Sequence, residues 1–93
     1  MNYKIKGLNF VKTCNACPEQ YDVYDKDGVE VVGYVRLRHG YIRADYPNCG
    51  GKTIFEREYG DEFTGIFENE NDRMRYLSDI ADAILEEKDE NNH

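Results

Sequence analysis

The chain has 93 residues, of which 40% are hydrophobic and 33% are charged. This length allows one domain and excludes two, and the composition is that of a soluble globular protein. No apolar run reaches the ~20 residues of a membrane-spanning helix, so we expect no membrane partner. The net charge of −7 is uneven: residues 1–50 hold seven basic and six acidic side chains, whereas residues 51–93 hold five and thirteen. Since an acidic chain is repelled by phosphate backbones, we expect a basic protein surface or a neutral partner and no direct binding of nucleic acid.

A first β-hairpin is predicted after a short strand over residues 10–13. Residues 21–24 alternate between the two faces of a strand and lead into the turn Asp-Lys-Asp-Gly at 25–28. Residues 29–38 form the return strand, with apolar or small side chains at the odd positions. This register places Cys17 opposite Leu37.

A second hairpin follows, because His39-Gly40 is a two-residue turn signal and residues 41–46 alternate again. With Arg38 opposite Tyr41, the apolar residues of both strands share one face, and a slip by one residue would separate them. The expected cross-strand pairs are Leu37–Ile42, Val35–Ala44 and Gly33–Tyr46. Pro47 ends this strand, and residues 53–59 have the pattern of a further one.

The last third of the chain has the pattern of one amphipathic helix, with Asn69 as its N-cap. The apolar stripe that should pack on the sheet consists of Met74, Leu77, Ile80, Ala81, Ile84 and Leu85. The opposite side carries the carboxylates of Asp79, Asp82 and Glu86. The predicted fold is α+β, an antiparallel sheet of about four to five strands with one C-terminal helix packed on it. We expect residues 1–88 to form this single domain and residues 89–93 to be a disordered tail.

Cys14 and Cys17 are spaced so that one tight turn can direct both thiolates at a metal ion. This spacing predicts a structural zinc that staples the small domain, like a zinc knuckle. Tetrahedral zinc takes four ligands, and Cys49 and His39 are the candidates for the remaining two. The expected register places Cys14 near Gly40, and therefore near His39, but it places Cys49 well over 20 Å away unless the chain returns after Pro47. Weaker candidates for the fourth ligand are Asp22, Asp45 and His93.

The cysteines also leave other uses open, namely buried or free thiols and a redox pair. Pro18 and the strand-like residues after it disfavour the redox pair, which normally opens a helix. An odd count of three cysteines is typical of reduced thiols, and the start of the chain lacks the pattern of a signal peptide. We therefore expect a cytoplasmic protein.

Arg36, Arg38, Tyr41 and Arg43 are expected on the outward face of the second hairpin. Interleaved basic and aromatic residues can bind nucleic acid, but they can equally pair with Glu30 and Asp45 within the sheet. No catalytic constellation is recognisable, since a thiol and an imidazole such as Cys14 and His39 do not by themselves make a nucleophile pair. We expect a binding protein and not an enzyme.

Five motifs together resemble a group of small proteins from phages and mobile elements of Gram-positive bacteria. They are CNACPEQYDVY (14–24), GYVRLRHG (33–40), DYP (45–47), CGG (49–51) and RMRYL (73–77). The group resembled includes at least one zinc-containing type II-A anti-CRISPR protein from a prophage. The resemblance implies a protein that binds a host type II CRISPR–Cas nuclease stoichiometrically and blocks its cleavage of DNA.

Such a nuclease is strongly basic where it holds RNA and DNA, so the acidic half of this chain would have an electrostatic target. The expected partner-binding residues are Asp79, Asp82 and Glu86 on the helix and Asp61 and Glu62 before it. The alternative is a zinc-stabilised adaptor or regulator of a phage or mobile element, which binds protein, or binds nucleic acid through Arg36, Arg38 and Arg43.

Overall fold

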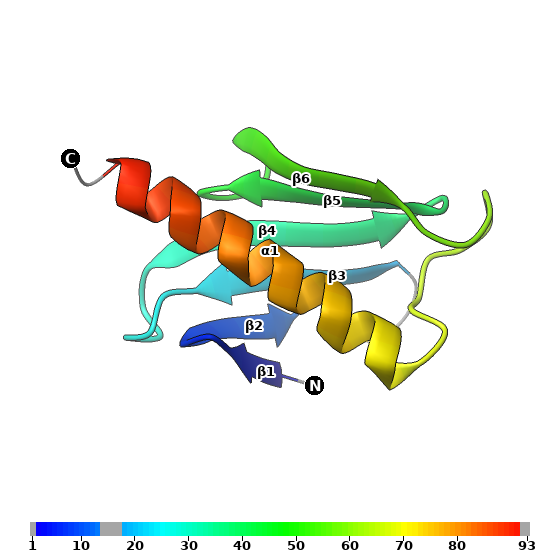
Figure 1. The fold of residues 1–93 in the computed structure, drawn as a ribbon, viewed down its shortest axis with the longest axis horizontal. Coiled ribbons are helices and arrows are strands. Elements are labelled where there is room, and N and C mark those ends of the chain that lie inside the picture. The colour runs from blue at the N-terminus through cyan, green and yellow to red at the C-terminus, as the bar shows by residue number, and fades with distance from the viewer. Residues whose placement is uncertain (1, 14–17, 92–93) are drawn as a thin grey trace.

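A computed structural model describes residues 2–13 and 18–91 of the chain. The strands are β1 (Asn2–Ile5), β2 (Leu8–Lys12), β3 (Glu19–Tyr24), β4 (Val31–Arg38), β5 (Tyr41–Tyr46) and β6 (Lys52–Glu58), and the helix is α1 (Glu70–Asn91). Each strand pairs antiparallel with its neighbours in chain order, and α1 crosses one face of the open sheet diagonally (Figure 1). This confirms the α+β fold with a C-terminal helix, although the sheet has six strands. The strand that the sequence did not predict is β1, whose NYKI segment is too short for a clear alternation.

The core lies between α1 and the face of the sheet that the helix covers. Leu77, Ile80, Ala81 and Ile84 are fully buried there, which confirms most of the predicted apolar stripe. Met74 and Leu85, at the two margins of that stripe, are exposed. Gly33 lies directly beneath the helix, since a Cβ atom at this position would be 2.7 Å from Ile84 Cδ1. The absent side chain therefore lets α1 approach β4 closely.

The register of the second hairpin is confirmed for the pairs Leu37–Ile42 and Val35–Ala44. His39 and Gly40 both have positive φ, 54° and 71°, as a tight two-residue hairpin turn requires. The expected pair Gly33–Tyr46 is absent from the β4–β5 register, which ends at Tyr34–Asp45.

The predicted register of the first hairpin is wrong by two residues, because Glu19 and not Cys17 lies opposite Leu37. Two features cause the difference: the register shifts between Val23 and Tyr24, and the turn is longer than predicted. Asp27 Oδ1 accepts hydrogen bonds from the backbone N–H groups of Val29 and Glu30, at 2.9 and 3.3 Å, so these residues belong to the loop. β4 consequently begins at Val31, and the Val29 side chain is 79% exposed.

Helix α1 begins as predicted, since Asn69 Oδ1 accepts a hydrogen bond of 2.8 Å from the Asp72 N–H. It runs to Asn91, so residues 89–91 are helical where we expected a disordered tail to begin. Lys52 Nζ contacts Glu87 at 2.7 Å, and Lys88 is bound to Asp25, so the last turns are tied to the sheet. Within residues 2–13 and 18–91, no helix is long and apolar enough to cross a bilayer.

Candidate binding surfaces

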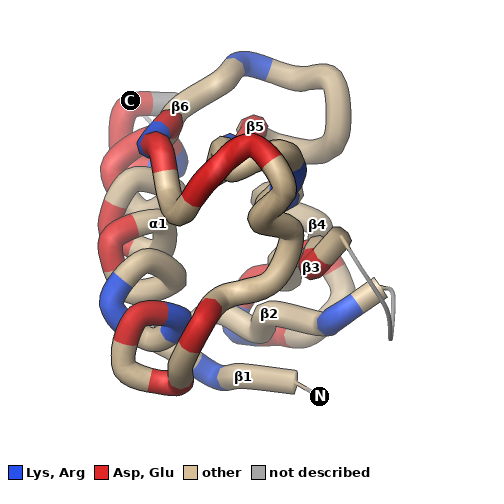
Figure 2. Tube along the Cα trace, turned by 90° about the vertical axis from the view of Figure 1, so that its right-hand side faces the viewer, with Lys and Arg blue, Asp and Glu red and all other residues tan. Residues whose placement is uncertain are grey.

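The acidic helix surface, defined by Asp79, Asp82 and Glu86, is exposed on the side of α1 that faces away from the sheet. Acidic residues recur along α1 and in the segment that joins it to β6 (Figure 2). One of the three carboxylates is engaged, because Asp82 Oδ1 lies 2.6 Å from Lys6 Nζ. This ion pair is itself exposed, so solvent and salt screen it strongly. The structure therefore brings the three predicted carboxylates together on one surface.

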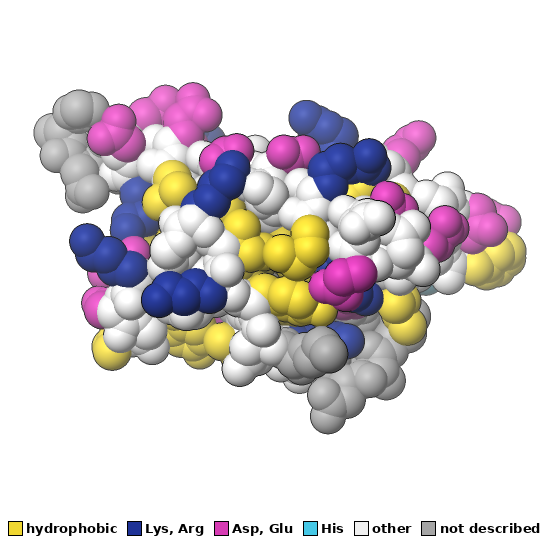
Figure 3. Space-filling view, turned by 60° about the horizontal axis from the view of Figure 1, so that its bottom comes forward, with side chains coloured by type: hydrophobic (Ala, Val, Ile, Leu, Met, Phe, Trp, Pro, Cys, Tyr) yellow, Lys and Arg dark blue, Asp and Glu magenta, His cyan; other side chains and the backbone are white. Residues whose placement is uncertain are grey.

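The Phe63 loop, residues 60–66, presents a large apolar side chain to solvent. Phe63 is 84% exposed, and Ile66 in the same loop is about half exposed. In Figure 3, hydrophobic atoms project beside acidic side chains at the end of the molecule where the segment between β6 and α1 lies. Asp61 and Glu62, both predicted as partner-binding residues, directly precede Phe63 and are exposed.

Internal hydrogen bonds fix the shape of the Phe63 loop. Asp61 Oδ1 accepts a bond of 2.9 Å from the Phe63 N–H, and the Asp61 N–H donates to Thr64 Oγ1 at 2.9 Å. The Thr64 N–H donates to the Asp61 carbonyl oxygen at 3.0 Å. Asp61 thus shapes the loop with its carboxylate, which leaves Glu62 as the adjacent carboxylate without such a role.

The loop is also bound to the sheet at two points. The Gly40 N–H donates to the Thr64 carbonyl at 2.8 Å, and the Glu19 N–H donates to the Gly65 carbonyl at 2.7 Å. Gly40 allows the close approach, because a Cβ atom there would stand 2.0 Å from the Asp61 carbonyl oxygen. The exposed ring of Phe63 is therefore carried by a segment with few ways to move.

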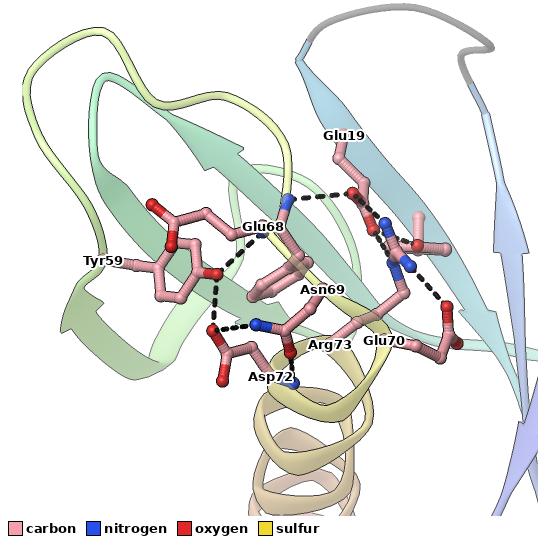
Figure 4. Close-up of polar contacts among 9 residues, drawn as sticks. Glu19, Tyr59, Glu68, Asn69, Glu70, Asp72 and Arg73 are labelled. Carbon is pink, nitrogen blue, oxygen red and sulfur yellow. Dashed lines mark hydrogen bonds and ion pairs between the residues drawn. The ribbon is translucent and has the colours of Figure 1, made fainter.

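A buried ion pair fixes the start of α1 beside this loop (Figure 4). Glu19 is only 1% exposed, and its carboxylate accepts bonds from Arg73 Nε at 2.7 Å and Arg73 Nη2 at 3.1 Å. The Phe67 N–H donates to Glu19 Oε1 at 3.2 Å, and the Tyr21 hydroxyl donates to Oε2. Burial raises the pKa of Glu19, but the bonds from Arg73, Tyr21 and Phe67 outweigh it and hold the pKa below its usual value.

The same group of residues explains the protonation of Tyr21 and Arg73. Burial, followed by the hydrogen bond to Glu19, raises the pKa of Tyr21. The hydrogen bonds to Glu19 raise the pKa of Arg73. Each partner thus stabilises the state that the others need: a charged carboxylate, a charged guanidinium and a neutral phenol.

A second polar surface, the arginine cluster, lies on the open face of the sheet, the face away from α1. Arg36, Arg38, His39, Tyr41 and Arg43 line a shallow hollow of about 110 Å³ there. Arg43 Nε lies 3.4 Å from Asp45 Oδ1, so one of the two predicted pairings is present. Glu30 instead lies in the loop between β3 and β4, where its carbonyl accepts a bond from the Asp25 N–H.

Of the four predicted metal ligands the structure describes two, His39 and Cys49, and it does not bring these two together. Cys14 and Cys17 lie outside the described residues. His39 is in the turn between β4 and β5, and Cys49 is exposed in the turn between β5 and β6, so the length of β5, roughly 20 Å, separates them. The flanking residues Thr13 and Glu19 lie at the His39 end of the sheet.

In the part of the chain that the structure describes, no group of three or more His, Cys, Asp or Glu side chains could hold a metal ion. Structural zinc at Cys14 and Cys17 stays a prediction, and of the two described candidates His39 shares an end of the sheet with Thr13 and Glu19.

Phe63 and the Glu19–Arg73 pair are the residues that sequence reasoning missed. The sequence does contain a signal for Phe63. Asp61 stands three residues before Thr64, which is followed by Gly65, and this pattern favours a loop closed by side-chain hydrogen bonds. An aromatic residue inside such a loop cannot reach the core. The ion pair has no local signal, because its partners are 54 positions apart.

Comparisons of the chain with protein-family models, with curated proteins and with solved structures gave no match. The resemblance to phage anti-CRISPR proteins therefore stays a prediction from the motifs, and the surfaces described above are the basis for a proposal.

Proposed function

We propose that the chain is a binding protein that docks the Phe63 loop and the acidic helix surface onto a basic surface of another protein. The observation that carries this proposal is the 84% exposure of Phe63 on a loop held by hydrogen bonds on both sides. An apolar anchor that is already ordered costs little conformational entropy on binding. Interfaces commonly combine such an aromatic anchor with a polar rim, and here the rim is acidic.

The partner that the motifs suggest is a host type II CRISPR–Cas nuclease in the cytoplasm, which the protein would inhibit by stoichiometric binding. The channel of such a nuclease is positively charged, because it holds a guide–target duplex by its backbone. Exposed carboxylates at Glu62, Asp79 and Glu86 complement that charge. A structural zinc at Cys14 and Cys17 belongs to the same proposal and is tested by metal analysis of the purified chain and of the variant Cys14→Ser.

The test is a DNA-cleavage assay with type II nucleases from Gram-positive hosts. Inhibition should saturate near equimolar protein, since a binder does not turn over, and it should weaken with added salt, since exposed charges are screened. Phe63→Ala should weaken inhibition roughly tenfold, mainly through faster dissociation, at an unchanged melting temperature. Reversal of Asp79, Asp82 and Glu86 to Lys together should slow association.

The two variants distinguish the contact surfaces. If Phe63→Ala inhibits as well as the wild type and the triple reversal does not, the helix surface alone forms the contact. If wild-type protein neither binds nor inhibits any such nuclease, the anti-CRISPR proposal is wrong. The alternative, an adaptor or regulator of a phage or mobile element, would then take its place, and the observation that favours it is the arginine cluster on the open face of the sheet.

A further inference from the structure

We propose that the arginine cluster on the open face of the sheet binds the backbone of a single-stranded nucleic acid. In the register of β4 and β5, Arg36 lies directly opposite Arg43, and Arg38 lies opposite Tyr41. Like charges directly opposite each other destabilise a pair of strands. Between β5 and β6 the charges across the strands are complementary instead, since Glu56 of β6 lies opposite Arg43 of β5. An arrangement that opposes stability is a reason to look for a ligand.

The guanidinium groups of this cluster have unused donors. Among the described residues, Arg36 has no carboxylate within ion-pair distance, and its partner on β3 is Gln20, whose side-chain oxygen accepts a bond of 2.9 Å from the Tyr34 hydroxyl. Within residues 2–13 and 18–91, Arg38 Nε donates only to His39 Nε2, at 3.2 Å. Arg43 Nε lies 3.4 Å from the Asp45 carboxylate. That carboxylate also accepts two shorter hydrogen bonds, from Thr53 Oγ1 at 3.0 Å and from the Gly50 N–H at 3.1 Å.

The geometry suits a sugar–phosphate strand. Arg36 and Arg38 are two positions apart on one face of β4, which separates them by about 7 Å along the strand. This spacing is comparable with that of successive phosphates in an extended single strand, and a guanidinium binds a phosphate with two parallel hydrogen bonds. Tyr41, which is 40% exposed, lines the same hollow and offers a ring on which a base can stack.

The net charge of −7 does not prevent such binding, because the charges are separated in space. The acidic helix surface lies beyond both the sheet and the helix, and the helix alone is about 10–12 Å thick. That distance exceeds the screening length of about 8 Å at physiological ionic strength. Nearer carboxylates do exist. Glu56 lies opposite Arg43 and is hydrogen-bonded to Tyr41, and Glu58, Asp61 and Glu62 line an adjoining hollow that shares His39 and Tyr41 with the cluster. They restrict the site to about two or three phosphates, so the expected affinity is modest.

The experiment is a titration of the full chain into a fluorescently labelled oligothymidylate and oligouridylate at several salt concentrations, read by anisotropy. We expect saturable binding with a slope of log affinity against log salt of about −2. The double variant Arg36→Gln/Arg43→Gln should bind at least tenfold more weakly and keep a melting temperature close to that of the wild type, since the loss of the Arg43–Asp45 contact offsets the removal of a repulsive pair. The matched control Arg57→Gln/Arg75→Gln removes the same charge from β6 and α1 and should bind like the wild type.

Three results would overturn the proposal. The first is no binding by the wild-type chain at low salt. The second is an equal loss of affinity in the control variant, which would mean that only net charge matters. The third is equal competition by a polyglutamate peptide of the same charge, which would make the site a receptor for acidic protein segments. Tyr41→Leu gives a further readout, because it should weaken binding severalfold and leave the salt slope unchanged.

Discussion

The two ends of α1 are attached to the sheet by the same chemistry, a carboxylate against a cation, in opposite surroundings. At the N-terminal end, Arg73 and Glu19 form a two-bond pair in which the carboxylate is buried. At the C-terminal end, Lys52–Glu87 and Lys88–Asp25 lie nearer the surface. Exposed pairs contribute little to stability, whereas breaking a buried pair leaves a charge without water or a partner. We therefore expect α1 to be held firmly where it adjoins the Phe63 loop and to fray at its other end.

The largest loss of stability should come from disrupting the core between α1 and the sheet, on which both ends of the helix depend. Leu77→Asp places an unpaired charge in the centre of the core and should unfold the chain, at a cost of more than ~4 kcal/mol. Circular dichroism and thermal melting measure this outcome. Asp79→Asn, two positions along on the exposed side, is the control and should melt like the wild type. A wild-type melting temperature for Leu77→Asp would mean that the helix does not pack as described.

Breaking the buried pair should have the next largest effect. Arg73→Ala leaves Glu19 charged and buried, and we expect a loss of about 3 kcal/mol in the free energy of unfolding, measured by urea titration. Phe63 should also become mobile, because Glu19 fixes the N–H of Phe67 and the carbonyl of Gly65. Fluorine NMR of a labelled Phe63 would detect this change, and a resonance with the chemical shift and linewidth of the wild type would contradict it.

Acid should weaken the buried pair at the N-terminal end. The folded-state pKa of Glu19 lies below its unfolded value of about 4.3, so its contribution to stability is present above that value and is lost as the pH falls through the folded pKa. The free energy of unfolding should therefore decrease below about pH 4. In Glu19→Gln this part of the pH dependence should disappear. A variant whose acid profile parallels that of the wild type would assign the effect to other carboxylates.

The smallest effects belong to the C-terminal end. Lys88→Gln should lower the free energy of unfolding by about 1 kcal/mol at most, since Lys88 and Asp25 are only partly buried. The hydrogen bond from Lys88 is the main cause of the lowered pKa of Asp25. Lys52→Gln should leave the melting temperature unchanged. Hydrogen exchange of the last two turns of α1 is the sensitive measurement, and it should speed up in Lys88→Gln while the first turns stay protected. Equal protection from hydrogen exchange along the whole helix in both variants would contradict the predicted difference in stability between the two ends of α1.

The sequence predicted what local patterns encode. The stripe around Ile80, the N-cap Asn69 and the turn His39-Gly40 each have short-range signals, and each is confirmed. The predicted register of β3 against β4 was wrong because the side chain of Asp27 lengthens the loop after β3 and because the register shifts between Val23 and Tyr24. No alternation of apolar residues reveals either feature.

For the candidate site, individual residues could be predicted from the sequence, but their positions relative to one another could not. The exposure of Asp79 follows from helical periodicity alone. The separation of His39 from Cys49 follows from strand pairing, and the anchoring of the Phe63 loop depends on contacts with Glu19 and Gly40 that only the folded chain brings about.

The order of the strands has a consequence for how the chain folds during synthesis. Every strand pairs with its neighbour in sequence, so the sheet can form hairpin by hairpin as residues emerge from the ribosome, without long loops to close. The apolar face of that sheet, with Phe10, Leu37 and Ile42, is covered only when α1 arrives last. A nascent chain stalled before Glu70 therefore exposes the apolar face of a completed sheet. We expect such chains to aggregate or to recruit a chaperone until the helix is made.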